Sequence, residues 1–477
     1  MSLKKQAVSG LVWTFSQQIG YQLISFTVGI ILARILAPAD FGLIAMFTVV
    51  MAVATALTDG GMTASLIRSK DLDELDFSTV FWFNIGTAIV LYILIYLTSP
   101  LIASFFDEAV LTNVIRVYSI ILLINSFGAV QNAQMTRDMN FRSLFKVQVP
   151  SLMIAGIAAV IMALNEFGVW TLVFYPIIQS VCYVIQIWLY SKWRPSFSFS
   201  KNKFRYHFNF GYKLTLSGLL DKIFANIYTV IIGKFFSPAD LGFYNRADTL
   251  KQLPVSNLST ALNKVTYPLF AKISHEQEKL KTVYKKLMKV VVFILAPILC
   301  LMASTAEPLI RFLLTEKWMP AIPYFQILAI AGILYPIHAY NLNILKVKGR
   351  SDLILKLEFI KKVLVIVILA LSIPFGVIGI VWGQVIFSIL AFFINTYYTD
   401  KILDYNFIEQ GIDLLPSIIL SLMIGGGIYY LNSSFFLDIP DFLRLVISGF
   451  IFVSLYLSAV FLMKFNEIRY VKELLKR

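Results

Sequence analysis

The sequence has little of what soluble enzymes and metalloproteins are built from. Only 14% of its 477 residues are charged, whereas soluble domains carry about 25%. Cys182 and Cys300 lie inside apolar stretches and the three histidines are far apart, so neither a disulfide nor a metal site is indicated. A G-x-x-x-x-G-K-S/T phosphate loop is absent, which excludes an ATPase of that type. We expect no catalytic residue, no metal and no bound cofactor.

Apolar residues dominate instead. They make up 58% of the chain, and the mean hydropathy is +0.77. A water-soluble protein could not bury this much apolar surface, so lipid must be the solvent. A membrane-spanning helix needs about 20 predominantly apolar residues. Fourteen such runs are predicted as spans: residues 10–35, 41–67, 80–106, 112–135, 144–164, 168–190, 213–236, 241–270, 288–306, 322–345, 359–374, 377–398, 412–432 and 442–463.

The net charge of +14 does not indicate a nucleic-acid partner, because the basic residues form short clusters between the apolar runs. With an inside N-terminus and alternating spans, roughly three quarters of the 41 lysines and arginines fall in inner segments. Positive charge in short loops favours the cytoplasmic side of a membrane. We therefore predict a multi-pass membrane protein with both termini in the cytoplasm.

A short motif occurs twice in the chain. Residues 33–42 read ARILAPADFG, and residues 233–242 read GKFFSPADLG. Six predicted spans separate the copies, so both halves begin on the same side of the membrane. This predicts parallel repeats, related by an axis along the membrane normal. We expect an all-α polytopic protein with two parallel six-helix lobes around a central cavity, residues 1–200 and 201–400, and two additional helices in residues 401–477.

Several stretches are similar to a known family of transporters. They are LAPADFGLIAMFTVV (36–50), DGGMTASLIRSK (59–70), AQMTRDMNFRSL (133–144), TEKWMPAIPYFQILAIAG (315–332) and LKVKGRSDLILKL (345–357). In this order they resemble the polysaccharide exporters, or O-unit flippases, of the multidrug/oligosaccharidyl-lipid/polysaccharide flippase superfamily. Within that group the similarity is to the colanic-acid-exporter branch of lipopolysaccharide biosynthesis proteins.

The resemblance implies a fourteen-helix transporter in the bacterial plasma (inner) membrane. Such a protein would move undecaprenyl-pyrophosphate-linked oligosaccharide repeat units between leaflets by alternating access, for O-antigen, capsule or exopolysaccharide biosynthesis. An H⁺ or Na⁺ gradient, rather than ATP, would supply the energy. The implied partners are the lipid-linked oligosaccharide, membrane lipids, and the polymerase and glycosyltransferases of the same pathway. The transporter would work as a monomer.

Polar side chains inside predicted spans are candidates for binding this substrate, because charge at membrane depth is costly. Lysine and arginine suit phosphate oxygens, and amides suit sugar hydroxyls. The candidates for lining a cavity are Lys222, Arg246, Lys251, Asn226, Arg34, Lys234, Gln17 and Gln18. The basic side chains near span ends, Arg34, Lys234 and Arg246, can instead extend to the head groups, and the amides can instead bond neighbouring helices.

Asp59 is the first candidate for ion or proton coupling. Two glycines follow it, which predicts a break in the second span where both protonation states of the carboxyl are tolerated. The alternative is that this span ends earlier and that Asp59 caps a cytoplasmic turn. Asp221 and Asp248 are the other two coupling candidates, although Asp221 can instead form a local pair with Lys222.

Residues 197–213 alternate aromatic with basic or polar residues and are predicted to lie in the head-group zone as the linker between the lobes. A membrane polysaccharide polymerase or glycosyltransferase is a weaker interpretation, because it needs a large outer loop with paired carboxylates or a metal site. Two further candidate functions belong to the same superfamily. A lipid II flippase shares the fourteen spans, whereas a cation-coupled drug antiporter typically has twelve.

Overall fold

The computed structural model describes residues 3–470, and for residues 3–12, 14, 15 and 261–265 it describes the backbone only. Nineteen α-helices and two short 3₁₀ turns, η1 and η2, make up the secondary structure of this part of the chain, which has no strand. The helices group into two compact units, Met1–Gly242 (unit 1) and Phe243–Arg477 (unit 2). The predicted all-α membrane fold is confirmed.

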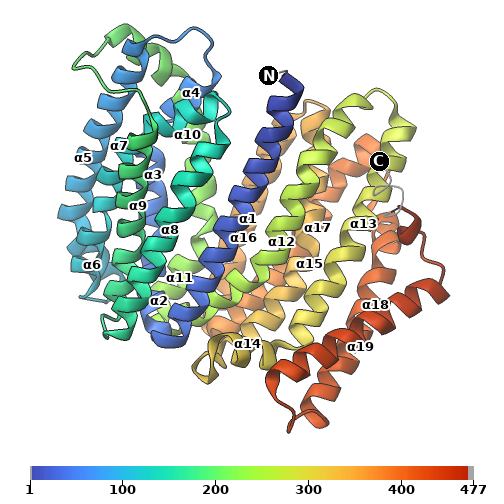
Figure 1. The fold of residues 1–477 in the computed structure, drawn as a ribbon. Coiled ribbons are helices and arrows are strands. Elements are labelled where there is room, and N and C mark those ends of the chain that lie inside the picture. The colour runs from blue at the N-terminus through green and yellow to red at the C-terminus, as the bar shows by residue number, and fades with distance from the viewer. Residues whose placement is uncertain (1–2, 471–477) are drawn as a thin grey trace. The chain divides into compact units, whose positions relative to one another are not determined.

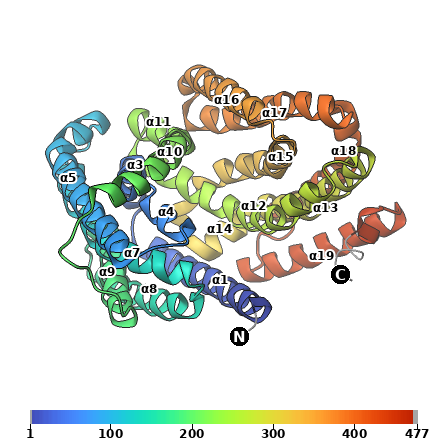
Figure 2. The same ribbon diagram turned by 90° about the horizontal axis from the view of Figure 1, so that it is seen from above.

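Unit 1 contains eleven helices and the first residues of a twelfth. Their bounds are α1 Leu3–Ile35, α2 Pro38–Met46, α3 Thr48–Asp59, α4 Met62–Arg68, α5 Glu74–Phe106, α6 Leu111–Tyr118, α7 Ile120–Arg137, α8 Phe141–Leu164, α9 Val169–Tyr190, α10 Lys201–Ala225 and α11 Ile227–Phe235. Seen from above, α5, α7, α9, α8 and α1 follow one another in an arc (Figure 2). Small residues allow close packing: a Cβ added at Gly156 on α8 would lie 2.6 Å from Val28 on α1.

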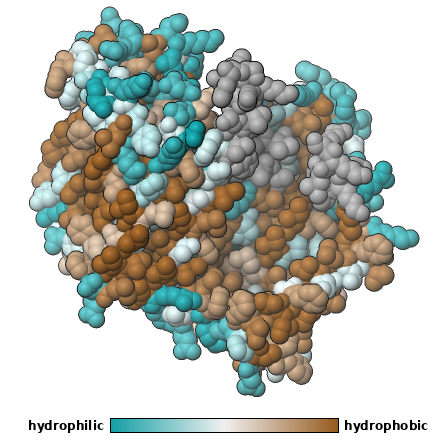
Figure 3. All heavy atoms as spheres, in the orientation of Figure 1, coloured by the Kyte–Doolittle hydropathy of each residue, from teal (hydrophilic) through white to brown (hydrophobic). Residues whose placement is uncertain are grey.

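Unit 1 has the surface expected of a protein in a bilayer. On the face shown in Figure 3, hydrophobic side chains cover the middle of its helices, and hydrophilic side chains gather at the helix ends. Many of the large apolar side chains on α5 and α8 are exposed, among them Leu97 at 68% and Ile157 at 61%. Such exposure is favourable where acyl chains rather than water surround the helix.

Two predicted spans in unit 1 are broken. The span at 41–67 consists of α2, α3 and α4, with a bend of 42° between α2 and α3 and left-handed backbone at Gly60 and Gly61. The span at 213–236 bends by 43° between α10 and α11. Helix α10 begins at Lys201, so most of residues 197–213 is the first half of a long helix rather than a separate interfacial linker.

A buried polar cluster holds α10 against α4 and α5. The two oxygens of Asp76 contact Lys203 Nζ at 2.8 Å and His207 Nε2 at 3.0 Å. The other ring nitrogen of His207 shares a hydrogen bond of 2.8 Å with Ser65 Oγ. Lys203 also contacts Asp73, the N-cap of α5, at 3.2 Å. Asp76 and His207 are fully buried, so each compensates the desolvation of the other.

The two copies of the repeated motif contact each other. A Cβ added at Gly42 would lie 1.7 Å from the carbonyl oxygen of Pro238, and one added at Gly242 would lie 2.0 Å from that of Pro38. The contact is therefore reciprocal, as a local two-fold relation requires. Asp40 accepts a hydrogen bond of 3.0 Å from the Ala37 N–H and so caps α2. The predicted lobe boundaries stay a prediction.

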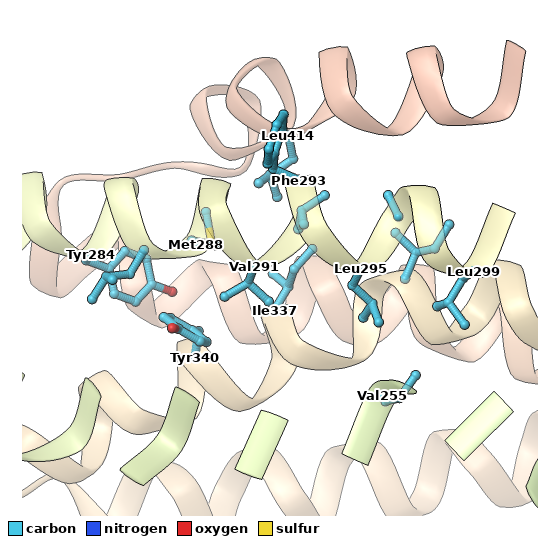
Figure 4. Close-up of a cluster of buried hydrophobic side chains, with 14 of the residues drawn as sticks. Val255, Tyr284, Met288, Val291, Phe293, Leu295, Leu299, Ile337, Tyr340 and Leu414 are labelled. Carbon is cyan, nitrogen blue, oxygen red and sulfur yellow. The ribbon is translucent and has the colours of Figure 1, made fainter. Parts of the chain in front are cut away.

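Unit 2 contains seven complete helices and most of α12 Pro238–Lys272. The other bounds are α13 Gln277–Ser304, α14 Ala306–Leu314, α15 Ala321–Val347, α16 Ser351–Ser372, α17 Gly376–Leu403, α18 Phe407–Ser434 and α19 Asp441–Leu462 (Figure 1). Figure 4 shows a core cluster of unit 2, in which Leu295 of α13 and Ile337 of α15 are buried. Within this core, Tyr284 donates a hydrogen bond of 2.8 Å to Asn341 Oδ1.

Fewer described segments qualify as membrane spans than the sequence predicts. Ten described segments are long and apolar enough to cross a membrane, or up to twelve if each bent pair counts as one span. One of the ten, Ser351–Leu403, contains both α16 and α17. Helix α12 has 35 residues but is not apolar enough to be included among these segments, because it carries many charged and polar residues. The count of fourteen stays a prediction.

Candidate functional site

Unit 1 contains an open polar pocket on helices that the sequence places in the bilayer. Its volume is about 320 Å³. It is formed by α1, α7, α8 and α9, and none of its lining side chains is charged. The lining residues are Gln17, Ile121, Asn125, Asn132, Gln148, Pro176, Gln179, Ser180 and Tyr183. We call this site the amide pocket, because five carboxamides dominate its polar surface.

Two of the amides form a hydrogen bond with each other, and the other three line the open pocket. Gln17 Nε2 on α1 donates a hydrogen bond to Gln148 Oε1 on α8. Asn125 and Asn132 are exposed, and within the described part of the chain no residue forms a side-chain hydrogen bond with Asn125, Asn132 or Gln179. An amide on a membrane helix without a protein partner needs water or a ligand, since its desolvation costs about 1–3 kcal/mol.

Sequence reasoning found part of this pocket. It named Gln17, and Gln18 beside it on α1 is exposed but does not line the pocket. It missed Gln148 and Gln179, although both are amides inside predicted spans. The rotation of α8 and α9 about their own axes decides which way these two side chains point, and packing sets that rotation.

The structure places Asp59 beside Lys222 at the break between α3 and α4. Asp59 is the last residue of α3, and its Oδ1 accepts a hydrogen bond of 3.1 Å from the Thr63 N–H. Lys222 Nζ donates to the carbonyl of Ala52 at 3.5 Å and acts electrostatically on Asp59. The predicted break is therefore present, and the Lys222 ammonium group lies within electrostatic range of the Asp59 carboxyl group.

Of the remaining unit 1 candidates, two contact protein groups in this conformation and two are exposed. Asn226 lies at the bend between α10 and α11, where its amide donates to the carbonyl of Lys222 at 2.8 Å. Lys234 forms an ion pair of 2.7 Å with Asp107 and lies over the ring of Phe105. Two candidates are exposed, Asp221 near the end of α10 and Arg34 in the last turn of α1.

In unit 2 the predicted candidates on α12 are already engaged with protein groups. The guanidinium of Arg246 lies over the ring of Trp318, 5.4 Å from its centre. Lys251 is buried and contacts Asp248 at 2.5 Å, one turn earlier on the same helix. Asp248 therefore neutralises Lys251, which lowers the cost of burying this ammonium group.

Unit 2 also contains a buried polar cluster that sequence reasoning did not single out. His338 Nε2 on α15 lies 3.0 Å from Ser388 Oγ on α17, and Asn395 Nδ2 lies 3.5 Å from His338 Nδ1. Lys361 on α16 is buried, pairs with Glu358 at 2.5 Å and acts electrostatically on His338. Across residues 3–470, no three His, Cys, Asp or Glu side chains are placed to hold a metal ion.

The family model described as "Polysaccharide biosynthesis protein" matches residues 31–323 of this sequence, more than half of the chain. The chain belongs to the polysaccharide biosynthesis protein family. One relative is the teichuronic acid biosynthesis protein TuaB of Bacillus subtilis, 27% identical over 85% of this chain and 84% of the relative. The lipopolysaccharide biosynthesis protein WzxC of Escherichia coli is also 27% identical, over 83% of this chain and 82% of the relative.

Solved structures show which fold this polysaccharide biosynthesis protein has. The lipid II flippase MurJ, in an inward closed conformation, superposes with a TM-score of 0.77, at 14% identity over 95% of this chain and 99% of that one. An inward-facing multidrug resistance MATE transporter of the MOP superfamily gives 0.62, at 16% identity over 80% and 96%. The chain therefore shares the fold of these two membrane transporters. The predicted membership of a polysaccharide biosynthesis family is confirmed, and the fold agrees with the predicted membrane transporter.

Proposed function

We propose that this protein is a flippase for undecaprenyl-pyrophosphate-linked oligosaccharide repeat units. It moves them by alternating access from the inner to the outer leaflet, for O-antigen, capsule or exopolysaccharide biosynthesis. The amide pocket carries the proposal. An open surface of unpaired amides on membrane helices is unfavourable against acyl chains but favourable along a path for water and a polar cargo.

The charged candidate residues suit the pyrophosphate group of this cargo. Lys222 and Arg246 are proposed to bind the pyrophosphate, with Lys251 near Arg246 and with Arg34 and Lys234 toward the outer end of the path. Arginine matches phosphate oxygens through its planar fork, and lysine acts as a point charge. Gln17, Gln18 and Asn226 are proposed to contact sugar hydroxyls.

An H⁺ or Na⁺ gradient is proposed to drive the cycle, with Asp59 as the first coupling residue and Asp221 and Asp248 as the others. The electrostatic effect of Lys222 on Asp59 supports this role, because an anionic cargo bound at Lys222 would offset the positive charge that acts on Asp59. Cargo binding and ion binding would then be linked thermodynamically.

The moving parts are proposed to be the two lobes, residues 1–200 and 201–400, with residues 401–477 as two added helices. We place the protein in the bacterial inner membrane with both termini in the cytoplasm, as a monomer. The glycosyltransferases of the same pathway would supply its cargo, and the polymerase would consume it. The uneven distribution of lysine and arginine supports this orientation.

The proposal is tested by complementation. The gene is expressed in a strain that lacks its own O-unit flippase, and surface polysaccharide is measured with a sugar-specific antibody. Wild-type protein is expected to restore the polymer, and Lys222→Ala and Arg246→Ala to reduce it by about tenfold or more, since hydrogen bonds to charged groups contribute about 1.5–3 kcal/mol. Full activity of both variants at wild-type protein levels would remove the two residues from the site.

A second strain separates this proposal from lipid II transport. In cells depleted of their lipid II flippase, wild-type protein is expected not to restore growth. Rescue of these cells, without rescue of the O-unit strain, would replace the proposed cargo by lipid II.

A further inference from the structure

The amide pocket differs from a phosphate-binding site in its chemistry. Phosphate sites use lysine, arginine or helix N-termini, because an anion moved out of water needs positive charge around it. The lining of this pocket contains no charged side chain. It offers five carboxamides, the hydroxyl of Ser180 and the ring of Tyr183, so its chemistry matches an uncharged polar group.

Carboxamides complement sugar hydroxyls in particular. Each Asn or Gln side chain presents two N–H donors and a carbonyl acceptor, and each hydroxyl both donates and accepts. Asn125, Asn132 and Gln179 have this capacity unused within the described part of the chain. Ile121, Pro176 and the Tyr183 ring add apolar surface to the lining, which suits the C–H face of a sugar ring.

The size of the pocket agrees with one sugar residue rather than with a single water molecule. Its volume of about 320 Å³ lies at the lower end of the range for small-molecule sites, about 300–1,000 Å³. A water molecule occupies about 30 Å³ in the liquid. The pocket is also open, so a ring attached to a longer chain can enter it.

We propose that the amide pocket is a carbohydrate subsite that binds one uncharged sugar residue and contributes to cargo selection separately from the phosphate-binding residues. This inference rests on the proposed function for the identity of the cargo. A sugar acid would be disfavoured in the pocket, because its carboxylate would lose water without gaining a cation. The subsite therefore distinguishes between repeat units by the charge and hydroxyl pattern of one residue.

The experiment measures sugar binding and carrier binding on purified full-length protein. Saturation-transfer NMR with free N-acetylglucosamine reports the subsite directly. Affinities for undecaprenyl pyrophosphate, with and without one attached N-acetylglucosamine, give the contribution of the sugar. The variants are Asn125→Ala with Gln179→Ala, and Asn125→Leu with Gln179→Met, which keeps the side-chain volume. Asn113→Ala is the matched control, since Asn113 is an exposed amide on α6 outside the pocket.

Wild-type protein and the Asn113→Ala control are expected to give a saturation-transfer signal and to bind the sugar-bearing carrier more tightly than the bare carrier. Each lost amide hydrogen bond should reduce this preference by about fivefold. In the double variants, both the signal and the preference should disappear, while the affinity for bare undecaprenyl pyrophosphate stays the same. N-acetylmuramic acid, which carries a carboxylate, should give no signal.

The failures can be told apart. If folded double variants keep the sugar signal and the preference, the pocket is not the subsite. If wild-type protein binds both carriers equally and gives no sugar signal, the subsite is wrong and the flippase proposal stands. If the sugar signal is present and depends on Asn125 and Gln179 but neither carrier binds, the subsite stands and the proposed carrier is wrong.

Discussion

The reciprocal contact between the two copies of the repeated motif makes a quantitative prediction. Gly42 and Gly242 lie in helices with ordinary backbone angles, so alanine is conformationally allowed at both positions. A Cβ at Gly42 would nevertheless lie 1.7 Å from the Pro238 carbonyl oxygen, and real Cβ contacts essentially never fall under 3.0 Å. The two backbones would therefore have to separate by about 1.3 Å at Gly42, and by about 1 Å at Gly242.

This separation cannot be absorbed by a flexible side chain, because the opposing atom in each case is a backbone carbonyl at the start of a helix. Overpacking costs about 1–3 kcal/mol. The higher helix propensity of alanine returns up to about 1 kcal/mol. We expect Gly42→Ala and Gly242→Ala each to be destabilised by about 1–2 kcal/mol, with the double variant less destabilised than the sum, since one separation relieves both clashes.

The assay is thermal unfolding of purified protein in one detergent, together with the yield of folded protein on size exclusion. Gly86→Ala and Gly449→Ala are matched controls, because both glycines are helical and nothing lies within 4 Å of an added Cβ at either position. These controls should unfold at the wild-type temperature or slightly above it. A Gly42→Ala variant as stable as Gly86→Ala would refute the close contact and, with it, the structural meaning of the repeat.

Three further predictions concern the contacts of α10 and α5. Gly61→Ala should lower the unfolding temperature more than Gly60→Ala. A Cβ at Gly61 would lie 2.4 Å from the Gly211 carbonyl oxygen, whereas the nearest atom to a Cβ at Gly60 is on the Phe83 ring edge, at 3.3 Å. Asp76→Asn should cost about 3–5 kcal/mol of stability, since it removes the buried carboxylate that contacts Lys203 and His207. Asp71→Asn, nearby in sequence and exposed, should cost almost nothing, and equal unfolding temperatures for the two variants would contradict this. The backbone N–H of Asp76 and the Lys203 ammonium group hold the pKa of Asp73 below its usual value. The stability that the ionised Asp73 contributes is therefore complete above about pH 4 and is lost as the pH falls through the lowered pKa. Asp73→Asn should remove this acid-dependent loss, measured as unfolding temperatures over a pH series.

Much of the fold followed from local sequence properties. Runs of about 20 apolar residues predict membrane helices because lipid requires every backbone group to be paired within the segment. Each of the fourteen predicted spans has a helix at its position, with ends usually within a few residues. Only ten to twelve described segments are long and apolar enough to cross a membrane. The glycines after Asp59 also predicted the break between α3 and α4, since left-handed backbone is cheap only at glycine.

The site was less accessible from the sequence. Asn125 and Asn132 lie on α7, Gln148 on α8 and Gln179 on α9, and nothing in their spacing shows that they share a pocket with Gln17. The partnership of Lys234 with Asp107, and of Asp76 with His207, joins residues well over a hundred positions apart. A hydropathy pattern predicts that a segment is helical and buried in lipid, but not which of its polar side chains face one another.

The sequence by itself determined the membrane solvent, the helical class, the duplication and the family, because each depends on residues close together in the chain or on their order. Only the tertiary structure decided that the two copies of the repeated motif contact each other through Gly42 and Gly242. It also decided that α10 begins at Lys201 and that four helices bring uncharged amides into one pocket. The physical reason is the rotation and close approach of helices, which small residues and side-chain packing set across long separations.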